Sequence, residues 1–131
     1  MDSIQIEGTP KTPTVRFDSE SGELVIKGRS IPENSIDFYK PLIDWLENYA
    51  TQPANSVILH MELEYFNTSS SKCILDVFKK LENIGKLGKT VTVKWHYEED
   101  DEDMLEAGED YSDLLDLKIN FIEEEDFVDH I

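Results

Sequence analysis

The sequence contains few of the residues from which catalytic and metal-binding signatures are usually built. Only one of its 131 residues is cysteine, so an intramolecular disulfide and a cysteine-rich metal site are both excluded. The chain also lacks a glycine-rich phosphate loop, a Gly-x-Ser-x-Gly turn and a His-Glu-x-x-His pair. We therefore expect no enzyme of these classes and no bound cofactor.

Basic residues are scarce as well. The chain has 12 Lys and Arg against 29 Asp and Glu, which gives a formal net charge of -17. Such a chain repels nucleic-acid phosphates and anionic lipid headgroups, so basic protein surfaces are the better-suited partners. No apolar run approaches the roughly 18 residues of a membrane-spanning helix. The opening MDSIQIEG lacks the basic and apolar regions of a secretory signal, so we expect a cytoplasmic protein.

What the chain does have is a regular series of short apolar patterns. Hydrophobic residues make up 39% of it, enough for a core. Its length suits one domain, which we place at residues 1–124, followed by an acidic, mobile tail at 125–131. Residues 1–12 have the composition of a loose lead-in. The patterns predict strands at 14–18, 23–28, 56–66, 90–97 and 117–122, and helices at 36–50, 69–85 and 104–115.

The order β-β-α-β-α-β-α-β predicts an α/β fold with parallel strands joined by right-handed crossovers. The strands alternate between apolar and polar residues instead of being apolar throughout, so helices should cover mainly one face of the sheet. The residues expected to face the helices are Val57, Leu59, Met61, Leu63, Tyr65, Val91, Val93 and Trp95. The residues expected on the open face are His60, Glu62, Glu64 and His96.

Imidazole and carboxylate groups on that open face could bind zinc, which makes a small metal-binding domain one alternative function. The spacing of His60, Glu62, Glu64 and His96 matches no known ligand signature, however, and polar side chains on a wet sheet face are the favoured interpretation. We therefore expect no metal site. The acidic run at 98–103 lacks the spacing of a calcium loop, and we expect it to serve solubility and steering toward a basic partner.

The helix at 36–50 has two apolar stripes instead of one. Its core stripe is expected to consist of Ile36, Tyr39, Ile43, Leu46 and Ala50. The second stripe offers Phe38, Trp45 and Tyr49 as candidate partner contacts. Packing at the edge of the core is the alternative role, slightly favoured for Trp45 and clearly favoured for Phe38. Pro41 predicts a kink or a late helix start. Cys73 is expected to be a small packed thiol.

A row of four hydroxyl residues, Thr68 to Ser71, separates the strand at 56–66 from the next helix. Asn67 or Thr68 can cap that helix, but capping explains one or two of these residues and not all four. A helix N-terminus is also a ready anion site. A phosphate ester there would add about -1.5 to -2 charges without unfolding the helix. Simple capping and reversible phosphorylation both remain open from this pattern alone.

Three segments point to a family. The stretches IPENSIDFYKPLIDWLENY, YFNTSSSKCILDVFKKLE and VKWHYEEDDEDMLEAGEDY resemble the SiaC family of bacterial regulatory phosphoproteins, over roughly residues 5–124. The resemblance implies a STAS-like fold, related to the anti-sigma-factor antagonists, and no catalytic activity. It implies control by a serine/threonine kinase of the histidine-kinase-like ATPase type and by a PP2C-type phosphatase. The dephosphorylated form would bind and activate a diguanylate cyclase, in cyclic-di-GMP and biofilm signalling.

The same resemblance implies that Thr68, in the motif NTSS, is the phosphoacceptor. Successive helical residues point about 100° apart, and only a residue at the cap projects along the axis, which also favours Thr68. Its expected neighbours are Asn67, Ser69, Ser70 and Ser71, and Lys72 is a further candidate partner contact. An anti-sigma-factor antagonist proper is the other alternative function.

Overall fold

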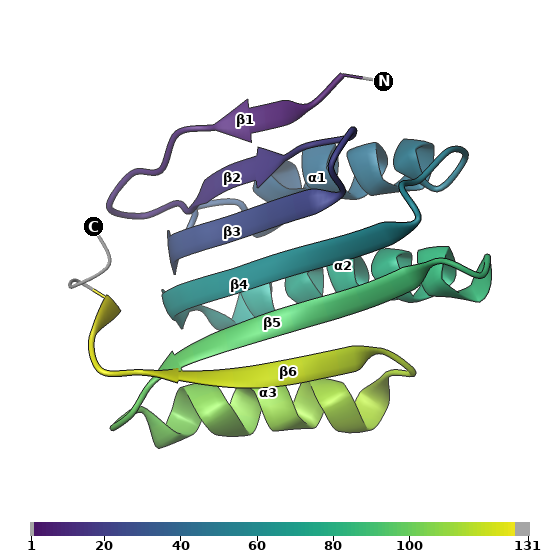
Figure 1. Ribbon diagram of the computed structural model, residues 1–131. Coiled ribbons are helices and arrows are strands. Elements are labelled where there is room, and N and C mark those ends of the chain that lie inside the picture. The colour runs from purple at the N-terminus through teal and green to yellow at the C-terminus, as the bar shows by residue number, and fades with distance from the viewer. Residues whose placement is uncertain (1, 128–131) are drawn as a thin grey trace.

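The chain folds into a six-stranded mixed sheet with helices packed on one face (Figure 1). The computed structural model describes residues 2–127. In chain order the elements are β1 (Ile4–Ile6), β2 (Thr14–Phe17), β3 (Glu23–Ser30), α1 (Ser35–Tyr49), β4 (Ser56–Phe66), α2 (Thr68–Lys86), β5 (Thr90–Glu98), α3 (Glu102–Leu114) and β6 (Lys118–Glu124).

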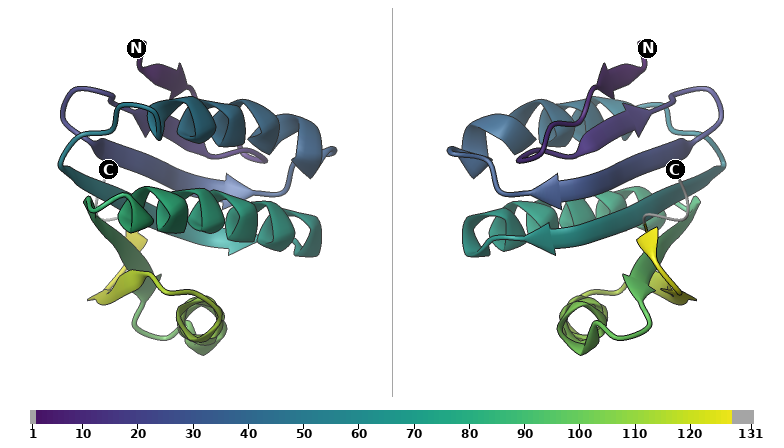
Figure 2. Two further views of the ribbon diagram at one scale, coloured as in Figure 1. Left: turned by 90° about the vertical axis from the view of Figure 1, so that its right-hand side faces the viewer. Right: turned by 90° about the vertical axis from the view of Figure 1, so that its left-hand side faces the viewer.

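The strands lie side by side in the same order as in the sequence. β1, β2 and β3 pair antiparallel, and β3 to β6 pair parallel, with one helix in each parallel connection. Successive right-handed crossovers that always advance in one direction place their helices on the same face. Figure 2 shows α1 and α2 side by side, with α3 beside the β5–β6 end of the sheet. The expected fold class is thereby confirmed.

β1 is an addition to the expected order, because the lead-in was not predicted to pair. Ile4 lies opposite Phe17 and Ile6 opposite Val15. A turn closed by hydrogen bonds between Thr9 and Thr12 brings the chain back into β2. The lead-in was not recognised as a strand because most of its residues are polar. Ile4 and Ile6 nevertheless lie two residues apart, and a strand needs only every second residue to be apolar.

The covered face carries the core, as the alternation predicts. Apart from Tyr65, the residues expected there are buried. Tyr65 is 52% exposed, because the pairing register shifts from Gly28–Leu63 to Arg29–Tyr65 and so skips one residue of β4. Such a bulge reverses which face the following side chains point to. Phe66 consequently reaches the core side, 6.3 Å from the Trp95 ring centroid.

The face of α1 is rotated relative to the expected core stripe. Its buried apolar residues are Tyr39, Leu42, Trp45, Leu46 and Tyr49, whereas Ile36 is 73% exposed. Trp45 packs 5.2 Å from Phe17 on β2. Both apolar stripes were visible in the sequence, but neither their width nor their spacing indicated which edge would meet the sheet. Pro41 predicted either a kink or a late helix start, and the late start is wrong, because α1 begins at Ser35 and includes Pro41.

α3 reaches the sheet through an unusually close contact at Gly108. A Cβ at this position would lie 2.7 Å from Trp95 Nε1 and 2.8 Å from Phe121 Cε1. The Trp95 indole N–H donates to the Met104 carbonyl at 3.0 Å. Tyr111 packs on Phe78 of α2. Gly108 therefore serves close packing, which compensates for its poor helix propensity.

Candidate functional site

The N-termini of all three helices lie along one edge of the sheet, where the parallel strands end. In α/β sheets this carboxyl edge is the usual location of functional sites. Each helix is capped in the same way, by a side chain that accepts from the third helical N–H: Asn34 from Asp37 at 3.1 Å, Asn67 from Ser70 at 2.9 Å and Asp101 from Met104 at 3.0 Å.

Thr68 is the first residue of α2 and is exposed. Asn67 is the cap, so Thr68 stands one position further into the helix than the sequence argument placed it. Asn67 accepts two hydrogen bonds from the start of the helix. Its side-chain oxygen accepts from the Ser70 N–H, and its backbone carbonyl accepts from the Ser71 N–H. Within residues 2–127, the N–H groups of Thr68 and Ser69 have no such partner, which leaves two donors at the positive end of the helix.

Ser70 belongs to a buried network of hydroxyl groups beneath this helix end. Its Oγ lies 2.9 Å from Ser30 Oγ at the end of β3 and 3.3 Å from Ser35 Oγ at the start of α1. Ser30 Oγ in turn lies 2.6 Å from the Tyr39 hydroxyl. Burial raises the pKa of Tyr39 to about 12, so the network consists of neutral hydroxyls at physiological pH. It ties β3, α1 and α2 together at the carboxyl edge.

The other two serines are also engaged within the domain. Ser69 Oγ lies 2.7 Å from Ser35 Oγ and donates to Asn67 Oδ1 at 3.2 Å. Ser71 Oγ donates to the Thr68 carbonyl at 2.7 Å. In the part of the chain that the structure describes, the Thr68 hydroxyl makes no hydrogen bond. The four hydroxyls thus divide into three that hold the helix end in place and one that is exposed and uncommitted.

The first turn of α2 contains no acidic residue, whereas that of α1 contains Asp37 and that of α3 contains Glu102 and Asp103. This is unexpected in a chain with 29 acids, because carboxylates near a helix N-terminus are stabilising. Lys72 is exposed one turn after Thr68, at the spacing at which helical side chains meet. The start of α2 therefore lacks a built-in anion and has a nearby cation.

The acidic run at 98–103 has a structural role that we did not predict. Asp101 caps α3, and the two acids after it lie in the first turn. Glu98 ends β5, and its pKa is raised by partial burial and then by the neighbouring carboxylates, Asp126 foremost. An Asp directly before the apolar pattern of a helix is a capping signal that could have been recognised from the sequence.

On the open face, the four residues considered for metal binding do not form one site. His60 Nε2 pairs with Glu23 at 2.7 Å. His96 Nδ1 instead faces Glu124 at 2.8 Å and Glu62 at 3.6 Å. Glu64 lies at the β4 bulge and joins neither pair. The partnership of His96 with Glu124 was missed, because Glu124 lies beyond the last strand that the sequence pattern predicted.

The candidate partner contacts are only partly at the surface. Trp45 and Tyr49 are 8% and 1% exposed, so the idea of an exposed aromatic flank is wrong for both. Phe38 is half-buried, and Lys72 is exposed. Cys73 is buried, and burial raises the pKa of its thiol, as expected for a packed cysteine. Larger exposed apolar groups near Thr68 are Tyr65, three residues before it, and Ile36, next to Ser35.

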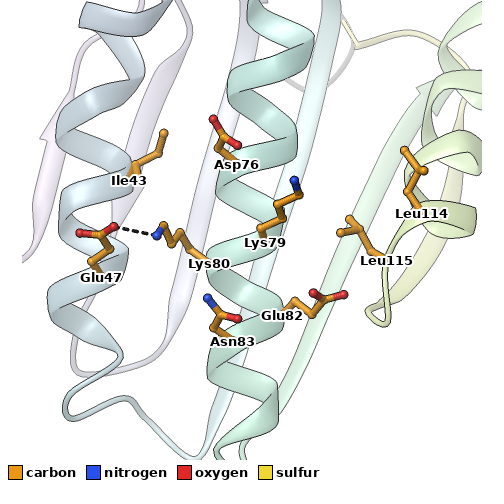
Figure 3. Close-up of a pocket in the computed structure, with 9 residues that line it drawn as sticks. All are labelled: Ile43, Glu47, Asp76, Lys79, Lys80, Glu82, Asn83, Leu114 and Leu115. Carbon is orange, nitrogen blue, oxygen red and sulfur yellow. Dashed lines mark ion pairs between the residues drawn. The ribbon is translucent and has the colours of Figure 1, made fainter.

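A groove of about 510 Å³ lies between α1, α2 and the end of α3 (Figure 3). It is lined by Ile43, Glu47, Asp76, Lys79, Lys80, Glu82, Asn83, Leu114 and Leu115. Lys80 and Glu47 form an ion pair of 2.7 Å within it. None of these lining residues is a histidine, cysteine or serine, and the groove begins about two turns along α2 from Thr68. We assign it no role in the site.

The fold and the site together define a small domain with a one-sided mixed sheet and an exposed hydroxyl at the N-terminus of α2. The sequence pattern of SiaC family regulatory phosphoproteins matches residues 6–124. The chain therefore belongs to the SiaC family. Within residues 2–127, no helix is both long enough and apolar enough to span a membrane.

Individual relatives agree with this membership. An uncharacterised protein of Pseudomonas aeruginosa (strain UCBPP-PA14) is 34% identical over 111 residues, which cover 85% of this chain and 88% of that protein. Apo-SiaC of Pseudomonas aeruginosa has a TM-score of 0.84 at 31% identity, covering 93% of this chain and 99% of that one. A chain in the crystal structure of the diguanylate cyclase SiaD in complex with its activator SiaC, from the same species, has a TM-score of 0.86 at 30% identity, covering 92% and 99%.

Proposed function

We propose that this protein is a non-enzymatic switch that binds and activates a diguanylate cyclase when unphosphorylated and is released when Thr68 is phosphorylated. The observation that carries the proposal is the difference in hydrogen bonding among the four hydroxyls of Thr68 to Ser71. Thr68 alone is exposed and without a hydrogen bond in the described residues, and it stands at a helix end without an acid in its first turn. SiaC of Pseudomonas aeruginosa, which shares the fold, is the activator of the cyclase SiaD.

The domain should remain folded when it is phosphorylated. A phosphate on Thr68 can accept hydrogen bonds from the N–H groups of Thr68 and Ser69 and can face Lys72 one turn later. It supplies the negative charge that this helix end lacks. The buried hydroxyl network beneath it is not disturbed, because the Thr68 side chain is not part of it.

The effect on binding follows from charge and desolvation. A partner that covers Thr68 must remove water from a phosphate of about -1.5 to -2 charges. If the partner's surface offers no cation to the phosphate, this desolvation costs several kcal/mol, whereas a micromolar complex has a binding free energy of only about -8 kcal/mol. Phosphorylation would then weaken a complex of that strength by orders of magnitude, with no change of fold.

The proposal includes the enzymes that change the state of Thr68. A serine/threonine kinase of the histidine-kinase-like ATPase type would add the phosphate, and a PP2C-type phosphatase would remove it, in the cytoplasm. The Thr68 hydroxyl is accessible to both. The neighbouring surface contributes Tyr65 and Ile36 as apolar contacts and the acidic run at 98–103 as a source of electrostatic steering.

The test is the affinity for a diguanylate cyclase of the same organism, measured by calorimetry with three variants. Thr68→Ala should bind like the wild type and stimulate cyclic-di-GMP synthesis, and Thr68→Asp should bind at least tenfold more weakly. Thr51→Asp is the matched control: this exposed threonine lies just after α1, at the opposite edge of the sheet. It should stay within about twofold of the wild type. Equal binding by Thr68→Asp and wild type would refute the switch.

A further inference from the structure

The open face of the sheet carries a compact group of three metal-ligating side chains, Glu62, His96 and Glu124. They come from the neighbouring strands β4, β5 and β6. One ligand atom from each lies within 4.8 Å of the other two. Their side chains are only 21%, 12% and 18% exposed, so they are held by the sheet and do not move freely in solvent.

We propose that Glu62, His96 and Glu124 form a binding site for a divalent transition-metal ion such as Zn²⁺. Imidazole nitrogen and carboxylate oxygen bind zinc at about 2.0 to 2.2 Å, which in a tetrahedron separates the ligand atoms by about 3.4 Å. The distances from His96 Nδ1 to Glu124 and Glu62, 2.8 and 3.6 Å, lie on either side of this value. Three protein ligands leave a fourth position for water on the uncovered face.

The group is rich in carboxylates. Two of them, Glu62 and Glu124, face a single imidazole nitrogen. Two further acids, Glu64 and Glu98, interact with each other nearby. A bound divalent ion would neutralise the two carboxylates and let them lie close together.

The orientation of the His96 ring places one nitrogen in the group. Nδ1 faces Glu124 and Glu62, whereas Nε2 is buried and has no hydrogen-bond partner in residues 2–127. Without a metal ion, an Nδ1–H can donate to Glu124 at 2.8 Å. A bound ion would take the place of this proton between Nδ1 and the carboxylates.

The site would have a mechanical consequence. β6 is the edge strand, and it pairs with β5 alone. An ion held by Glu62, His96 and Glu124 would link this edge to both β5 and β4. Because it binds only the folded chain, it should raise the melting temperature, and the rise should continue with the logarithm of the free zinc concentration after the site is filled.

The experiment is calorimetric titration of the untagged full-length chain with ZnCl₂, with thermal unfolding as a second readout. We expect one Zn²⁺ per chain with micromolar or tighter affinity. Loss of a residue that only hydrogen-bonds to a metal ligand usually weakens metal binding by about 10- to 100-fold, and loss of a direct ligand should cost at least as much. We therefore expect His96→Ala to reduce zinc affinity about 100-fold or more and Glu62→Gln about tenfold or more. The Co²⁺ form of the wild type should show tetrahedral absorption bands.

His60→Ala is the matched control. His60 lies on the same face and pairs with a single carboxylate, Glu23, so this variant loses a similar ion pair outside the proposed site. Its zinc affinity and its zinc-induced rise in melting temperature should match the wild type within about twofold. The proposal is overturned if the wild type does not bind at 100 μM Zn²⁺, a concentration about 100-fold above a dissociation constant of about 1 μM. It is overturned as well if His96→Ala and Glu62→Gln bind like the wild type, or if His60→Ala loses binding equally. It is also overturned if Ca²⁺ binds as tightly as Zn²⁺, which would indicate general attraction to an acidic surface.

Discussion

The starts of α2 and α3 are built on the same plan but differ in charge. Each follows a parallel strand, and each is capped by a side chain that accepts from the third helical N–H. In α3 the cap and the next two residues are all acids, Asp101 to Asp103, so the positive end of the helix is matched by permanent carboxylates. In α2 the corresponding positions are an amide and hydroxyls. The comparison teaches that the start of α3 carries its own carboxylates, whereas the start of α2 carries none and would gain a negative charge only through the proposed phosphorylation.

The two helices also differ in how they are anchored. The start of α2 is held by polar groups, the buried hydroxyls of Ser30, Ser35 and Ser70. α3 is held by close apolar packing, with Gly108 against the Trp95 ring. A buried polar anchor specifies one position for the helix end, because displaced hydroxyls would be left without partners. In the proposed switch, this anchor would hold the start of α2 in place when Thr68 receives a phosphate.

The largest expected effect comes from replacing the buried serine at the start of α2 with a charged residue. Ser70→Asp should destabilise the domain by about 4 kcal/mol, because its carboxylate would be buried among neutral hydroxyls. Thr68→Asp should change the free energy of unfolding by less than about 1 kcal/mol, since its carboxylate is exposed at a helix N-terminus. Urea denaturation of both variants measures the contrast. Similar losses in the two would contradict the assignment of Ser70 to structure and Thr68 to the surface.

An intermediate effect is expected at the anchor of α3. Gly108→Ala should destabilise by about 2 kcal/mol, because the new methyl group would collide with the Trp95 and Phe121 rings. Gly85→Ala in α2 is the control, since its Cβ would meet only Val91 Cγ2 at an ordinary 3.8 Å. This control should stabilise by about 0.5 to 1 kcal/mol through helix propensity. Thermal unfolding of the pair decides whether Gly108 is there for packing; a stabilised Gly108→Ala variant would show that it is not.

The smallest effect tests the charge difference directly, by exchanging the two caps. Asn67→Asp should stabilise by about 0.3 to 1 kcal/mol at low salt, because it gives α2 its first acid near the N-terminus. Asp101→Asn should change stability by less than about 0.5 kcal/mol, since Glu102 and Asp103 remain and repulsion from Glu98 is relieved. Denaturation at low and high salt separates the electrostatic part. If Asn67→Asp gives no gain at low salt, the positive end of α2 is not available to an anion in the way we describe.

The sequence predicted the fold well because period-two alternation in β4 and β5 leaves little freedom in which face is buried. It failed where one residue changes the phase, at the β4 bulge that turns Tyr65 outward. It also failed on α1, where two adjacent apolar stripes left the orientation of the helix to the tertiary packing. The strand β1 escaped notice because three residues carry too little pattern.

At the site, the sequence indicated the row of hydroxyls but not their separate roles. Ser70 is buried and Thr68 exposed because the helix turns by about 100° per residue, which could be anticipated. The partners of Ser70 could not, since Ser30 and Ser35 are 40 and 35 residues away in the chain and are brought there by the crossover. The same holds for Glu124, which reaches His96 only through the parallel pairing of β5 and β6.

The most direct test of the switch is to recover the chain from its own cells, separate the phosphorylated form and map the phosphate by tandem mass spectrometry. Thr68 is the one member of the row whose hydroxyl is both exposed and free of hydrogen bonds within residues 2–127, so the phosphate should lie on Thr68 and be absent from Thr68→Ala. Phosphate on Ser69 or Ser71, or phosphorylation that persists in Thr68→Ala, would contradict the account.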